Sequence, residues 1–145
     1  MMTDLVEILR AKTEELGWIF DYGRRDFQNL NDADSENDAK WYFFLDPIST
    51  DNSNPSVVVS TGYYMVLSKS DLDQQYDSTD GSDVDDGKFR KYILPKKEYL
   101  KNEFRNLIEC DKDIEITKSI TTDVINMFDT NFDGVLVNFT ITQFL

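Results

Sequence analysis

The stretch Val135–Phe144, with the sequence VLVNFTITQF, decides the fold. Four apolar side chains between Val135 and Ile141 alternate with Asn138 and two threonines. Alternation with a period of two residues is typical of a strand that buries one face and exposes the other. The chain therefore contains a β-sheet, and this strand is its clearest member.

The hexapeptide Asp129–Gly134, DTNFDG, lies directly before this strand and matches the first six positions of an EF-hand calcium loop. The twelfth position, however, is Thr140, where a calcium loop has a bidentate glutamate. The residues that follow have the period of a strand and not of a helix. Asn, Asp and Gly are also the usual residues of hairpin turns. We predict a hairpin turn, and calcium binding by Asp129–Gly134 stays an open alternative.

The other strands are expected on the N-terminal side of this turn. In Ser56–Ser68 the large apolar residues share one parity, while Ser60 and Gly62 take the other, and Gly62 suggests a bulge or bend. Lys88–Leu94 is interpreted as a strand and Ser49–Pro55 as a turn. Trp18 and Trp41 lie at strand positions, so we expect core side chains there. The remaining predicted strands are Trp18–Tyr22, Trp41–Asp46 and Ile114–Val124.

Two segments have the 3.6-residue period of amphipathic helices. Residues 4–16 place leucines and an isoleucine along one stripe, and Gly17 follows where a left-handed C-cap is expected. Pro95 is expected to open the second helix in its first turn, where a missing N–H costs nothing. That helix is predicted to end near Glu109, and Cys110 just beyond it is interpreted as structural.

These elements predict one α+β domain over residues 1–145. The expected order is helix, three strands, helix, two strands, with an acidic loop inserted before the second helix. Strands that are mainly antiparallel and are accompanied by two helices indicate an antiparallel sheet or sandwich whose helices cover one sheet face.

Charge and composition exclude several classes of function. The 145 residues contain 28 acids and 15 bases, a net charge of −13, which argues against binding nucleic acid through its phosphates. With no histidine and one cysteine, a Cys/His zinc site and a histidine-based triad are excluded. The N-terminus lacks a signal-peptide pattern, and no apolar run exceeds five residues, so we expect a soluble protein made in the cytoplasm, with no membrane partner.

The acids are concentrated in one segment. Asp71–Gly87 has seven aspartates and no base, and we expect residues 70–90 to form a mobile loop. Docking to a basic partner is favoured there over calcium chelation, because the spacing fits no defined loop. Arg24 and Arg25 follow a strand and are a candidate anion site or interface anchor. The candidate interface residues are Arg24, Arg25, Asp77, Asp80, Asp83, Asp85 and Asp86.

No set of residues predicts catalysis. The composition allows paired carboxylates for glycoside hydrolysis, but a domain of this size leaves little room for the deep, loop-lined cleft that such hydrolases use. No histidine is present to activate Cys110. We therefore predict a protein that is not an enzyme and needs no cofactor or metal.

The order of elements resembles that of the tail-terminator and head–tail connector (neck, tail-completion) proteins of tailed bacteriophages. The likeness rests on order and pattern and not on a short motif. It implies a structural virion protein, assembled in the host cytoplasm, that forms a sixfold or twelvefold ring of itself, binds adjacent neck or tail proteins, and lets DNA pass without sequence-specific contact. An acidic lumen would then repel the DNA phosphates. The segments that carry the likeness are Asp4–Leu16, Trp41–Asp46, Ser56–Ser68, Pro95–Glu109 and Asp133–Ile141.

Three other functions fit parts of the same sequence. An acidic inhibitor that mimics DNA would explain the charge, although seven acids gathered in one segment are poorly spread for mimicry. A calcium-dependent binding module would use the aspartate-rich segments. A small enzyme would need a deep pocket with carboxylates of raised pKa.

Overall fold

The longest strand pair of the molecule joins Val57–Lys69 (β4) to Phe132–Phe144 (β6). The two strands run antiparallel over their whole length, from Val57 opposite Phe144 to Lys69 opposite Phe132. The computed structural model describes residues 4–23, 40–69, 89–110, 113–127 and 132–145.

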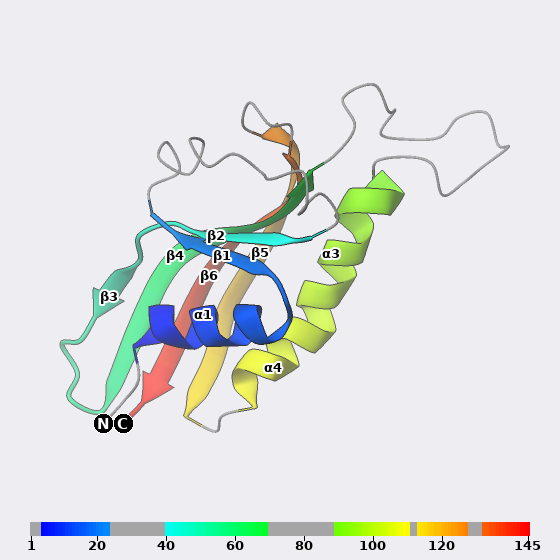
Figure 1. Cartoon of the computed structure of the whole chain (residues 1–145). Helices are drawn as coiled ribbons and strands as arrows, with labels where there is room; N and C mark the ends of the chain where they lie inside the picture. Colours follow the sequence, from blue (N-terminus) through cyan, green and yellow to red (C-terminus); the bar gives the residue numbers. More distant parts are fainter. Residues whose placement is uncertain (1–3, 24–39, 70–88, 111–112, 128–131) are drawn as a thin grey trace, which may run out of the picture.

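The six strands of the described residues form one mixed, mostly antiparallel sheet in the order β1-β2-β4-β6-β5 (Figure 1). Only β1 and β2 run parallel. The short strand β3 pairs with the first half of β4, so part of the predicted turn Ser49–Pro55 is a strand. The remaining strands are Ile19–Tyr22 (β1), Tyr42–Leu45 (β2), Ser49–Asp51 (β3) and Ile114–Met127 (β5).

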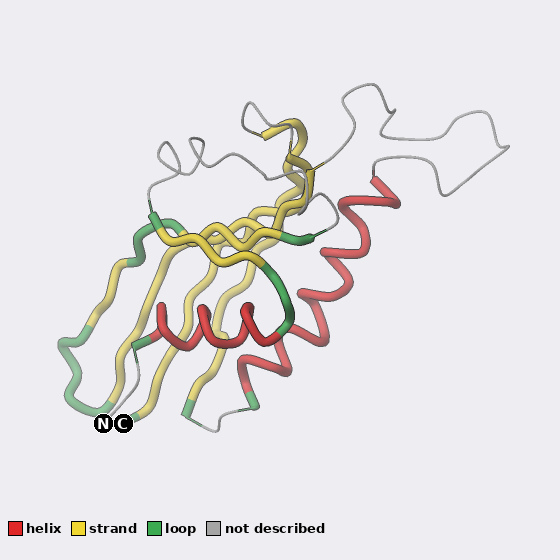
Figure 2. Tube along the Cα trace, in the orientation of Figure 1, coloured by secondary structure: helices red, strands yellow, loops and turns green. Residues whose placement is uncertain are grey.

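The two helical segments lie on the same face of the sheet (Figure 2). The first is Leu5–Glu15 (α1), and the second is a continuous helical run from Phe89 to Glu109. The predicted α+β class, with helices against a mainly antiparallel sheet, is confirmed. The second run consists of Phe89–Ile93 (η2), Leu94–Tyr99 (α3), Leu100–Phe104 (η3) and Arg105–Glu109 (α4).

The ends of α1 follow from the local sequence. The Asp4 carboxylate accepts a hydrogen bond of 2.9 Å from the backbone N–H of Val6, which otherwise has no partner in the helix. Gly17 adopts a φ of 81° beyond the last turn. A left-handed residue at this place satisfies the last carbonyls at little cost only when it is glycine, so the predicted C-cap is confirmed.

The second helical run begins earlier than predicted. Phe89–Ile93 is helical, so the strand predicted over residues 88–94 is wrong, and residues 89 and 90 do not belong to a loop. η2 has π-helical turns, and Pro95, which has no N–H, follows in the first turn of α3. Ile93 is 1% exposed in the core on the helix side of the sheet. Burial of this side chain favours a helix that begins before Pro95 over one that begins at Pro95.

Both faces of β4 are buried in its second half. Tyr64 and Val66 belong to the core under the helices, whereas Met65 and Leu67 belong to a smaller cluster on the opposite face. The prediction of one apolar parity and one small polar parity is therefore wrong for this half. Trp18, half-buried, has its ring centroid 5.4 Å from that of Phe104, as a core side chain should.

Candidate functional site

The charged residues predicted as an interface lie outside the described residues. Arg24 and Arg25 fall in 24–39, and the five aspartates from Asp77 to Asp86 fall in 70–88. They stay a prediction. Asp129 likewise lies outside the described residues.

The last residues of the calcium-loop match lie in the sheet. Phe132, Asp133 and Gly134 are the first residues of β6, and Asp133 is 0% exposed, opposite Ser68 of β4. β5 and β6 are antiparallel neighbours, as the predicted hairpin requires. The predicted turn therefore ends before Phe132, and Asp133 is a core residue. Among the described residues no group of three or more potential metal ligands occurs.

On the sheet face opposite the helices, the half next to Val57–Tyr63 of β4 is partly exposed, whereas the other half carries the smaller buried cluster. Side chains directly opposite one another in antiparallel strands share a face, so Tyr63, Asn138 and Ile120 form a row across β4, β6 and β5. Because Tyr64 faces the helices, this row faces away from them. The side chain of Ile120 is 52% exposed and that of Tyr63 is 37% exposed.

The open face is nearly neutral in a strongly acidic chain. The next two rows are Thr61–Thr140–Lys118 and Val59–Thr142–Glu115. On β4, β6 and β5 these rows and the row through Tyr63 carry one base and one acid, and Asp51 of β3, opposite Val59, adds a second acid. The whole chain carries 28 acids and 15 bases. We call the nine residues of the three rows the open face.

The strand β5 forms one edge of this sheet, and β1 forms the other. β5 is 14 residues long, and no strand in the described part of the chain pairs with its outer side. Every side chain from Thr117 to Asp123 is exposed. A long edge strand presents a row of backbone N–H and C=O groups to which another strand can pair.

A buried lysine joins the second helical run to the sheet. The Nζ atom of Lys96 donates to Ser68 Oγ at 2.7 Å and to the Tyr92 carbonyl at 2.5 Å, and it lies 4.9 Å from the centroid of the Trp41 ring. Burial lowers the pKa of Lys96 to about 7, and the nearby Asp133 carboxylate opposes part of this change. The amine is enclosed, with 1% of Lys96 exposed, so we interpret it as a structural link and not as a nucleophile.

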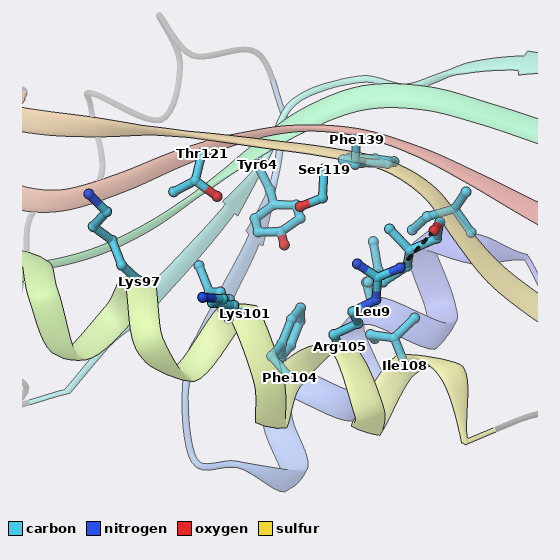
Figure 3. Close-up of a pocket in the computed structure, with 13 residues that line it drawn as sticks. Leu9, Tyr64, Lys97, Lys101, Phe104, Arg105, Ile108, Ser119, Thr121 and Phe139 are labelled. Atoms are coloured by element: carbon cyan, nitrogen blue, oxygen red, sulfur yellow. Dashed lines mark hydrogen bonds between the residues drawn. The ribbon is translucent and has the colours of Figure 1, made fainter.

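A cavity of about 250 Å³ lies between the helical run and the sheet (Figure 3). Phe104 and Ile108 line its helix side, Tyr64 and Phe139 line its sheet side, and Ser119 lies on β5. Lys97, Lys101 and Arg105 follow one another at intervals of four residues along the helix side. The cavity is therefore apolar at its floor and polar at its rim.

Cys110 is exposed at the end of α4, and its Sγ atom donates to the Leu107 carbonyl at 3.0 Å. Lys12 Nζ of α1 donates to the same sulfur at 3.7 Å. These contacts tie the end of α4 to α1, which is compatible with the predicted structural role.

Sequence reasoning missed the cavity because its residues come from separate elements. The intervals between Lys97, Lys101 and Arg105 were available as a signal, since residues four apart share one face of a helix. The sequence did not indicate that Tyr64 faces the helices. The apolar pattern of β4 predicted that the alternate residues, among them Tyr63 and Met65, face the core.

Comparison with known proteins gives no relationship: no family model, no curated protein and no solved structure matches the chain. Within the described ranges, no helix is long and apolar enough to cross a membrane. The function is therefore argued from the geometry of the open face, the edge strand and the cavity.

Proposed function

We propose that this protein is a non-catalytic structural component that assembles with copies of itself into a ring, of the kind found at the neck or tail end of phage particles. The observation that carries the proposal is the open face together with the free edge of β5. Both are surfaces that a second protein chain can cover without disturbing the core.

Charge supports a second copy of this chain as the partner. Two molecules of net charge −13 repel one another over most approaches. The open face is less acidic than the chain as a whole, because its nine residues carry one base and one acid, with Asp51 of β3 beside them. Exposed Tyr63 and Ile120 supply apolar area at the two ends of one of its rows.

The two different edges of the sheet favour assembly into a ring over assembly into a closed dimer. A ring needs a heterologous contact, in which two different surfaces meet. β5 at one edge and β1 at the other are such surfaces, and Tyr22 of β1 is 42% exposed. Pairing β5 of one subunit with β1 of the next would extend the sheet from subunit to subunit. The acids elsewhere on the surface would then keep DNA from adhering as it passes through.

The test is the mass of the purified chain by light scattering, followed by electron microscopy. We expect a closed ring with a central opening, at six or twelve subunits. Ile120→Lys should give monomers with an unchanged thermal midpoint, because Ile120 lies half-exposed on β5, where the open face meets the edge of the sheet. The matched control is Ala11→Lys, which adds the same charge on an exposed position of α1 and should leave the ring intact.

Two outcomes would overturn the proposal. One is a wild-type chain that stays monomeric at millimolar concentration. The other is a ring that Ile120→Lys leaves unchanged. A monomer that binds a DNA-binding enzyme in competition with DNA would instead support the acidic inhibitor.

A further inference from the structure

The cavity beneath the helical run has the composition of a ligand site and is separate from the open face. Its floor is made by apolar side chains of both layers, among them Leu100 and Phe104 from the helical run and Phe139 from β6. Such floors bury the apolar body of a ligand, while a few polar groups fix its orientation. The polar groups of this cavity indicate what kind of ligand would be held.

The rim carries positive charge that the protein's own acids neutralise only in part. Lys97 Nζ lies 3.1 Å from Asp123 Oδ1, and Arg105 Nε donates to Glu109 Oε1 at 3.0 Å. Lys101, between them, makes no ion pair or hydrogen bond with any described residue. An ammonium group at the rim of an apolar cavity, in a chain of net charge −13, favours an anionic ligand.

Besides Lys101, the Tyr64 hydroxyl is a second and independent indication of a ligand in this cavity. Its side chain is 7% exposed and its hydroxyl points into the cavity toward the helical run (Figure 3). That hydroxyl has no hydrogen-bond partner among the described residues, although its ring packs against Phe43 with centroids 4.6 Å apart. The hydroxyl opens on the cavity, where an atom of a ligand can reach it and accept its hydrogen bond. Burial raises the pKa of Tyr64, so the hydroxyl keeps its proton and remains a donor.

We propose that this cavity binds a small carboxylate with an apolar body, such as a medium-chain fatty acid or an aryl carboxylate. The carboxylate accepts from the Tyr64 hydroxyl and is paired with Lys101, and the chain or ring lies on the apolar floor. Hydrogen bonds between a neutral donor and an ionised acceptor are about twice as strong as neutral ones.

The size of the cavity limits the ligand. Its volume of about 250 Å³ exceeds the roughly 150 Å³ cavity that holds a benzene molecule. It is below the range of roughly 300–1,000 Å³ that is usual for drug-sized ligands. An eight-carbon carboxylate is therefore a suitable probe, and a folded peptide or a nucleotide is too large.

The test is calorimetric titration of the full chain with octanoate, with 1-octanol as the uncharged comparison. We expect saturable binding of one octanoate per chain and at least tenfold weaker binding of octanol. Tyr64→Phe should weaken octanoate about tenfold through the lost hydrogen bond to a charged group. Lys101→Gln should weaken it about two- to fivefold, the range for an exposed ion pair, and leave octanol unchanged.

The matched control is Lys118→Gln, which removes the same charge on the open face and should leave octanoate affinity as in the wild type. Three results would overturn the proposal: no binding of octanoate, equal binding of octanoate and octanol, or full affinity in Tyr64→Phe. Because these readouts do not depend on mass, they separate this inference from the proposed ring. Folding of each variant is checked by its thermal midpoint.

Discussion

At the scale of single residues, Tyr64 is where ligand binding should change and stability should not. Tyr64→Phe keeps the ring and removes a hydroxyl that opens on the cavity and has no hydrogen-bond partner among the described residues. We expect the free energy of unfolding of the ligand-free chain to change by less than about 0.5 kcal/mol, because no hydrogen bond within the described residues is lost. Urea denaturation measures this. A loss of about 1 kcal/mol would instead mean that the hydroxyl has a structural partner.

Lys96 should make stability depend on pH. In the folded chain its pKa is about 7, and in the unfolded chain it returns to 10.5. Between these values the unfolded state holds a proton that the folded state has lost, so stability rises with pH. The slope is at most about 1.4 kcal/mol per pH unit. Above pH 10 the raised pKa of Tyr64 acts in the opposite direction, so the useful window is pH 7 to 10.

The measurement is urea denaturation across that window for the wild type, Lys96→Met and Lys118→Met. Lys96→Met should abolish the rise, because the buried amine that loses its proton on folding is then absent. Lys118 is exposed on β5, and its replacement should keep the wild-type slope. A slope that survives in Lys96→Met would show that other groups produce it.

At the scale of the elements, the register of β4 and β6 depends on Gly134. A Cβ atom at Gly134 would overlap the Val66 carbonyl oxygen and lie 2.9 Å from the Leu67 Cα, both of them backbone atoms of the partner strand. Gly134→Ala should lower the free energy of unfolding by about 2–3 kcal/mol, as overpacking does in cores. Gly23→Ala is the control, because a Cβ there meets nothing within 4 Å. Chemical denaturation that finds the two variants alike would contradict the close approach.

The second helical run shows why one element was predicted only in part. Its buried face comprises Phe89, Ile93, Lys96, Leu100 and later members at the same intervals, which is the period of a helix. The sequence did not indicate that this buried face extends to the N-terminal side of Leu100. Lys96 is a charged residue, which is rarely buried, and Pro95 suggested that the helix begins there. Only the structure shows that Ser68 and the Tyr92 carbonyl satisfy the buried amine.

For the whole molecule, the spacing of apolar residues in each segment was enough to predict the α+β class and the central strands. It did not predict which strands are neighbours, because the parallel pair of β1 and β2 depends on contacts distant in sequence. The candidate site was predicted from charge, at Arg24, Arg25 and the aspartates, and that prediction lies outside the described residues. The cavity required coordinates, since its lining comes from α1, the second helical run and three strands.

The net charge of the whole molecule should make self-association depend on salt concentration. If two copies meet at the open face, the contact itself carries little charge, but each copy brings a net charge of −13 toward the other. Salt shortens the range of that repulsion to about 8 Å at 0.15 M, so self-association should strengthen as salt is raised from low concentration. Sedimentation equilibrium measures this, and Ile120→Lys should remain monomeric at every salt concentration. A contact made by ion pairs would behave oppositely and weaken with salt, which would direct attention from the open face to Arg24, Arg25 and the acidic segment as the interface.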